Sequence, residues 1–158
     1  MPLNADERSQ IAGAFHEAMP AIEEMFHIYA RQAGAPERFA LGIFDASGAG
    51  QDDAVGGDPA ARAIAEHTIK TADWVNNHTE TARKKVRASL RTGRDTGDLV
   101  RNARELFQEG DQSSPGACLA EVAGKRICVA TSGLRGTEDE PFSLLVIELI
   151  KRRLTPPA

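Results

Sequence analysis

The N-terminal part of the chain carries apolar residues at the spacing of one helical face. Over residues 5–32 they recur in steps of three and four, at Ile11, Phe15, Ala18, Ile22, Met25 and Tyr29. Side chains that line a single side of an α-helix have this period. Pro20 lies inside the run and has no amide hydrogen to donate, so the pattern predicts either a kinked helix or two helices.

Three shorter apolar runs have the length expected of β-strands. The first spans residues 39–44, and turn-forming residues follow it over 45–58, which predicts a surface loop. The other two runs span residues 117–122 and 126–131. Only residues 123–125 separate them, so we expect a β-hairpin.

Apolar periodicity also predicts three further helices. Residues 58–81 place Ile64, Thr68, Ala72 and Val75 at spacings of four, four and three. A short helix is expected over residues 99–107. The last helix spans residues 142–154 and ends in basic residues, which suit the negative end of the helix dipole. Residues 137–140 match a capping box before this helix, with Thr137 as its first residue.

Together these elements predict an α/β (α+β) fold with helices packed on a mixed or antiparallel sheet. The 158 residues, of which 41% are apolar and 27% charged, are expected to form one domain over residues 1–158. A net charge of −4 argues against a nucleic-acid partner. With neither a secretory signal nor an apolar run long enough to span a bilayer, a cytoplasmic protein without membrane association is expected.

The two cysteines, Cys118 and Cys128, lie on the two strands of the expected hairpin. They match no Cys-x-x-Cys pattern, and the sequence contains no zinc-type cluster, so we expect free thiols and no metal site. A register difference of one residue would place them on opposite faces of the sheet. Packing as small apolar side chains is favoured over a redox pair.

A basic segment precedes the short helix. Residues 83–94 contain six of the nineteen lysines and arginines, namely Arg83, Lys84, Lys85, Arg87, Arg91 and Arg94. A solvated face balanced by acids elsewhere is favoured over an anion-binding surface.

The C-terminal third carries motifs that resemble the haem-degrading-domain family. Thr131-Ser132-Gly133 stands where that family has a strand ending in valine-serine-glycine, and Glu138-Asp139-Glu140 stands where it has an acidic helix start. Upstream, residues 43–48 resemble its valine-valine-Asp-Ala-x-Gly strand end, and residues 64–65 with 71–72 resemble its central helix. The resemblance covers about residues 39–150.

This resemblance implies a mixed sheet with packed helices, symmetric homo-oligomers and, in some members, binding of haem or a corrinoid-related ligand. We therefore expect an oligomeric domain that binds a small ligand, with haem or another tetrapyrrole as the named candidate. Two alternatives stay open. One is a structural or interaction protein that uses residues 5–32, and the other is an enzyme acting on a small organic acid.

The turn over residues 132–136 is one candidate ligand site. It leads into a helix N-terminus, where amide hydrogens attract anions, and Ser132, Gly133 and Arg135 are the expected contacts for a carboxylate or phosphate. The alternative is a glycine-rich connection needed only for backbone geometry. Ser132 lacks a Gly-x-Ser-x-Gly context, and the acidic run suits a helix start better than acid–base catalysis, so no catalytic residue is assigned.

Haem would also need an axial ligand, usually histidine, and an apolar pocket. The candidates are the four histidines, His16, His27, His67 and His78. His16 and His27 are eleven residues apart and share a face of an unbroken helix beside the apolar stripe, which favours these two. Surface histidines without a ligand are the alternative for each.

Overall fold

The computed structural model describes residues 1–34, 38–51, 58–69, 76–134 and 137–155. In chain order its main elements are α1 (Ala5–Ala33), β1 (Phe39–Asp45), α2 (Pro59–Arg62), β2 (Ala63–Ile69), α3 (His78–Thr92), α4 (Thr96–Asn102), the 3-10 turn η2 (Arg104–Leu106), β3 (Ala117–Val122), β4 (Lys125–Ser132) and α5 (Asp139–Leu154). The fold is therefore α+β, as expected.

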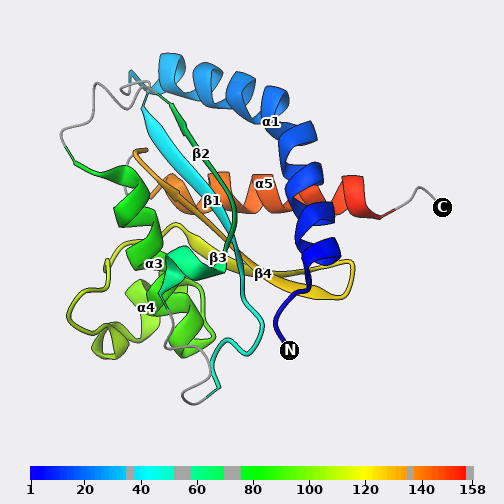
Figure 1. Ribbon diagram of the computed structural model, residues 1–158. Helices are drawn as coiled ribbons and strands as arrows, with labels where there is room; N and C mark the ends of the chain where they lie inside the picture. Colours follow the sequence, from blue (N-terminus) through cyan, green and yellow to red (C-terminus); the bar gives the residue numbers. More distant parts are fainter. Residues whose placement is uncertain (35–37, 52–57, 70–75, 135–136, 156–158) are drawn as a thin grey trace.

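The first helix, α1, is one helix with a proline inside it. Asn4 and Glu7 close a capping box at its N-terminus, and Gly34 ends it in the left-handed conformation. Pro20 lies within it, and Figure 1 shows the helix changing direction about halfway along. Of the two alternatives, the kinked helix is the correct one.

The four strands form one antiparallel sheet in the order β2-β1-β4-β3. Successive side chains of β1 point to opposite faces of the sheet, and helices cover both faces. Phe39, Leu41 and Ile43 pack with α1 and α5, whereas Phe44 packs with α3. Figure 1 shows this arrangement, with α3 and α4 on the side away from α1.

The predicted hairpin and the packing of both cysteines are confirmed. In the β3–β4 register Cys118 is opposite Val129, and Cys128 is opposite Leu119. That one-residue offset sends Cys118 to the α1/α5 face and Cys128 to the α3 face, where both are buried free thiols.

The helix predicted over residues 58–81 is wrong over residues 63–69, while residues 70–75 lie outside the described residues. Residues 59–62 make one helical turn, and 63–69 are the edge strand β2, paired with β1. A spacing of four, such as that between Ile64 and Thr68, also keeps two residues on one face of a strand, and β-branched residues suit strands. Residues 64–65 therefore do not belong to a central helix, and 71–72 lie outside the described residues.

Two of the other predicted helices are present, with different starts. The short one begins earlier than expected, as α4, and η2 follows it. The last one, α5, begins at Asp139 with Glu138 at the N-cap position and no side-chain cap, so the predicted Thr137 capping box is wrong. The Asp139 carboxylate instead turns inward to Lys85. No described helix is long and apolar enough to cross a membrane.

Candidate functional site

A pocket of about 660 Å³ opens where the N-terminus of α3, the end of β4 and the start of α5 meet. Its lining is mainly polar and carries several cationic side chains. Ser132 and Gly133 come from the end of β4, His78 and Lys84 from α3, and Arg38 from the residue before β1. The strand pairing of Ala40 with Ser132 brings the Arg38 segment beside the end of β4.

A buried ion pair forms the floor of this pocket. Lys85 Nζ lies 2.7 Å from Asp139 Oδ2 and donates to the carbonyl of Thr131 at 2.9 Å. The amide of Leu134 donates to Asp139 Oδ1. Burial raises the pKa of Asp139 to about 6, while Lys85 and the Leu134 amide act in the opposite direction. The contact with Lys85 favours the charged carboxylate, and the pair ties α3 to α5.

Gly116 makes room for this ion pair. Its φ is +138°, and a Cβ there would lie 2.8 Å from Lys85 Nζ and 2.7 Å from the Thr131 carbonyl oxygen. A side chain at residue 116 would thus displace the lysine or the strand. Ser143 Oγ donates to the Gly116 carbonyl at 2.7 Å, and this completes a buried polar contact between β3 and α5.

The pocket brings His78 to Ser132, with His78 Nδ1 3.3 Å from Ser132 Oγ. Burial lowers the pKa of His78, and the positive charges of Arg38 and Lys85 lower it further. The imidazole is therefore neutral at pH 7 and presents a polar ring to the pocket.

A serine beside a neutral histidine has the composition of a nucleophile and its base. In that chemistry the histidine becomes cationic, and a carboxylate stabilises it. At His78 the strongest nearby charges are instead two cations, Arg38 and Lys85, which disfavour an imidazolium. The arrangement suits anion binding better than nucleophilic catalysis.

The predicted ligand-binding residues separate into two groups. Ser132 and Gly133 both line this pocket. Gly133 also has φ +113°, and a Cβ there would meet the Arg38 carbonyl oxygen at 2.7 Å, so its backbone role is real as well. Arg135 lies outside the described residues.

His16 and His27 do not line this pocket. Both lie on α1, where His16 is exposed beside Phe15, and His27 lines a separate open groove of about 550 Å³. That groove also contains Glu23, Glu24 and Arg31, so its charges are mixed.

Most of the basic segment 83–94 is partly exposed and paired with acids, in keeping with the solvated face we favoured. Arg83 contacts Glu66 through two nitrogens, and Arg91 contacts Asp111 in the same way. Lys85 is the exception, because it is only 1% exposed.

The sequence analysis did not identify Lys85 as a site residue, and it named His78 only as one of four candidate histidines. For Lys85 a signal existed: it lies three residues after Ala82 and four before Ser89, on the helical stripe that α3 buries. A lysine on an apolar stripe calls for a buried partner. His78 had no such signal, because its contact with Ser132 spans 54 residues of sequence.

The fold and the pocket together define a class of protein: a four-stranded antiparallel sheet between two helical layers, with a polar, cationic pocket at one end. Comparison with protein-family models found no match to the sequence, and comparison with curated proteins found none. Solved structures do match the fold.

One similar structure is the Klebsiella pneumoniae protein ORFY, described as a DUF336 protein, with a TM-score of 0.58 and 9% identity over 96% of this chain and 92% of that one. A double mutant of Streptomyces reticuli HbpS matches with a TM-score of 0.55 and 14% identity over 99% and 89%. A PduOC–haem complex matches with a TM-score of 0.52 and 17% identity over 94% and 95%. The chain shares its fold with these proteins.

Proposed function

We propose that this chain is a small-ligand-binding domain whose ligand is a small organic acid held in the pocket beside Ser132. The observation that carries the proposal is the charge of that pocket. Arg38 and Lys84 line it, and Lys85 lies in its floor. A carboxylate entering there gains charge-assisted hydrogen bonds from the cations and a neutral hydrogen bond from Ser132 or His78.

The acidic groups of the pocket do not cancel this charge. Asp139 is already neutralised by Lys85 at 2.7 Å, which leaves Glu80 as the carboxylate opposite Arg38 and Lys84 among the described lining residues. Asn77 accepts the Glu80 amide as the N-cap of α3, so the positive end of this helix also faces the region. With Lys85 and Asp139 paired, two cations face one carboxylate among the described lining residues, and this balance together with the helix end favours an anion.

Haem fits this pocket poorly. A haem site needs apolar walls for the macrocycle, and Leu134 is the only described lining residue with an aliphatic side chain. The pocket does supply one neutral imidazole, that of His78. Haem stays the second candidate because one protein of the same fold is a haem complex, with His16 and His27 as the ligands to be tested on α1.

Calorimetric titration with acetate, succinate and citrate tests the organic-acid proposal. We expect saturable binding of at least one acid, weakened about tenfold in Lys84→Gln because a charge-assisted contact is lost. Lys151→Gln is the matched control, because Lys151 lies in the last turn of α5 beside Glu148. Equal affinities in the two variants, or no binding of any acid, would reject the proposal.

A haemin titration followed by the Soret band tests the second candidate. If haem binds through α1, His16→Ala or His27→Ala abolishes the Soret shift while His78→Ala leaves it unchanged. A shift that survives all three substitutions, or no saturable shift, rejects haem ligation by these histidines.

The resemblance also implies a homo-oligomer, and we propose that two copies meet at the apolar groove between α1 and α5. The stripe on α1 covers the chain's own sheet, so the groove rather than the stripe is the surface for a second copy. Ile28 and Leu145 line it and are 40% and 39% exposed. Leu145→Glu should convert the oligomer to a monomer in light scattering, whereas a monomeric parent protein would exclude self-association.

A further inference from the structure

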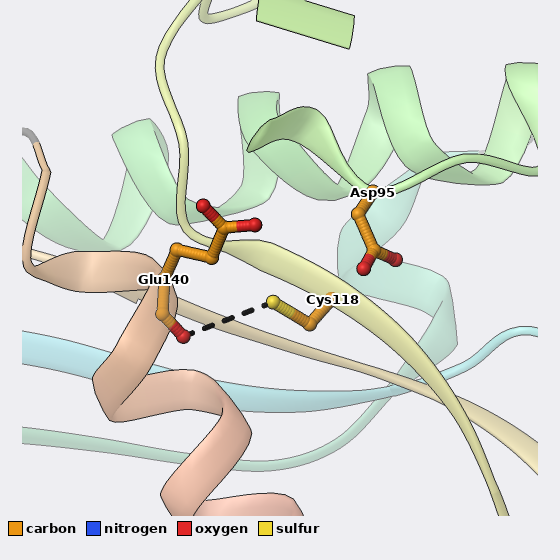
Figure 2. Close-up of side chains that lie close together, drawn as sticks. All are labelled: Asp95, Cys118 and Glu140. Carbon is orange, nitrogen blue, oxygen red and sulfur yellow. Dashed lines mark hydrogen bonds between the residues drawn. The ribbon is translucent and has the colours of Figure 1, made fainter. Parts of the chain in front are cut away.

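Three side chains with metal-binding atoms converge outside the pocket described above. Asp95 precedes α4, Cys118 lies on β3, and Glu140 lies in the first turn of α5. One donor atom from each lies within 4.8 Å of the other two. Figure 2 shows the three side chains close together, with the Cys118 sulfur in contact with the main-chain carbonyl of Glu140.

Three different elements therefore place donors around one point. Around a tetrahedral zinc ion with bonds of about 2.0–2.3 Å, two ligand atoms lie about 3.3–3.8 Å apart. The three donor atoms lie within 4.8 Å of one another, so the side chains must move inward to hold one ion.

Asp95 is directed to this point by an unusual helix start. It occupies the N-cap position of α4, where aspartate commonly accepts an amide of its own helix, yet it makes no such bond. Its Oδ1 accepts the amide of Leu119 on β3 at 2.8 Å instead. This bond holds the carboxylate beside Cys118 and does not use the other oxygen.

Glu140 is held in place from two sides. Arg101 donates to both of its carboxylate oxygens, at 2.9 and 3.1 Å. Gly97 lies under the same carboxylate, and a Cβ at residue 97 would be 2.3 Å from it. Each carboxylate oxygen has two acceptor positions, so the bonds from Arg101 leave acceptor capacity for an ion.

The donor set selects among metals. Binding of an ion would displace the proton of the Cys118 thiol. The resulting thiolate excludes Mg²⁺ and Ca²⁺, which take oxygen ligands, and favours a softer ion. One sulfur and two carboxylates make three protein ligands, the number that Zn²⁺ takes where a fourth position is left for water. Cys118 is fully buried while Glu140 is 17% exposed, so an ion would reach the site from the carboxylate side.

We propose that Asp95, Cys118 and Glu140 form a zinc site with one open coordination position, and that Arg101 orients Glu140 within it. The site is separate from the organic-acid pocket and does not depend on it.

Titration of the chelator-treated full chain with Zn²⁺ and Co²⁺ tests this proposal. We expect one Zn²⁺ per chain, and with Co²⁺ a thiolate-to-metal charge-transfer band in the near ultraviolet. Cys118→Ser should remove the band and weaken Zn²⁺ binding by about tenfold or more. Cys128→Ser is the matched control, because Cys128 is equally buried on the other face of the sheet.

Asp95→Asn and Glu140→Gln provide an independent readout that keeps Cys118 intact. Both should weaken Zn²⁺ binding by about tenfold while keeping the charge-transfer band. Circular dichroism checks that each variant is folded, and if Cys118→Ser is not, the two carboxylate variants decide. A parent protein that binds no Zn²⁺, a band lost with Cys128 instead of Cys118, or unchanged affinity in both carboxylate variants would overturn the proposal.

Discussion

The space between the sheet and α1/α5 differs sharply from the junction where α3, β4 and α5 meet. The first, the apolar layer, is filled by side chains such as Phe26, which stacks on Phe39 at 4.5 Å and meets Phe142 edge-on. The second, the polar junction, consists of Lys85, Thr131, Asp139 and Ser143, all buried and hydrogen-bonded to one another or to the backbone.

The two regions stabilise the fold in different ways. The apolar layer removes hydrocarbon from water, and its contribution grows with the area buried. In the polar junction, specific ion-pair and hydrogen-bond partners offset the cost of removing the charges from water. Its contribution to the free energy of unfolding therefore depends on every partner being present. The proposed ligand pocket lies beside the junction, where the buried Lys85 and Asp139 border an open space.

The largest effect is expected from breaking the buried ion pair. Lys85→Met should lower the free energy of unfolding by about 3–5 kcal/mol, because it leaves the Asp139 carboxylate buried without its cation. Urea denaturation followed by circular dichroism measures this. The double variant Lys85→Met/Asp139→Leu should recover much of the loss, and a single variant that costs less than about 1 kcal/mol would show that the junction is not organised by this pair.

A substitution in the apolar layer should lower the free energy of unfolding by less than Lys85→Met does. A second substitution there should not restore the lost stability. Phe26→Leu removes buried ring carbons and is expected to cost about 2 kcal/mol, through lost transfer free energy and a residual cavity. The same denaturation assay applies. If Phe26→Leu lowered the free energy of unfolding by more than Lys85→Met, the apolar layer would be the more sensitive region, against this prediction.

A second buried carboxylate, Asp45, offers a contrast with Asp139. Burial would raise the pKa of Asp45, but hydrogen bonds from the Ser47 hydroxyl and from the amides of Leu3 and Ser47 lower it below the usual value. Its stabilisation is therefore complete above the unfolded-state pKa, about 4, and is lost as the pH falls through the lower folded-state pKa.

Asp45→Asn should then cost about 1.5 kcal/mol at pH 7 and flatten the acid side of the stability curve. Chemical denaturation at a series of pH values from about 7 down to about 2 measures both effects. If the free energy of unfolding fell with pH equally in the parent and the variant below pH 4, the assigned role of Asp45 would be contradicted.

The smallest effect is expected in the hairpin turn, which belongs to neither region. Ala123 has φ +49°, a left-handed conformation that costs alanine more than glycine. Ala123→Gly should raise the free energy of unfolding by up to about 1 kcal/mol and leave ligand binding unchanged. A clearly lower melting temperature for Ala123→Gly than for the parent would contradict backbone strain at Ala123.

The same contrast explains what the sequence could predict. The apolar layer follows from the spacing of Ile11, Phe15 and Ile22 and from alternation along 39–44, so α1, β1 and the hairpin were predicted. The strand β2 was not predicted, because residues four apart lie on one face of either a helix or a strand. Only the pairing with β1 distinguishes the two.

The polar junction depends on contacts that no local pattern contains. Lys85 meets Asp139 across 54 residues, and His78 meets Ser132 across 54 residues as well. Of the predicted ligand-binding set, Ser132 and Gly133 line the pocket in the turn that was predicted to follow a strand, while His16 and His27 are on α1. Ligand binding by any of them, and the single-domain organisation of residues 1–158, stay predictions.

Mapping the binding site by NMR tests the central claim most directly. During titration with the organic acid that binds most tightly by calorimetry, backbone amide shifts should change most at Asn77, Ser132 and Leu134, around the pocket. Shifts concentrated on α1 near His16 and His27, with none at Ser132, would contradict the claim that this chain binds its ligand beside the polar junction.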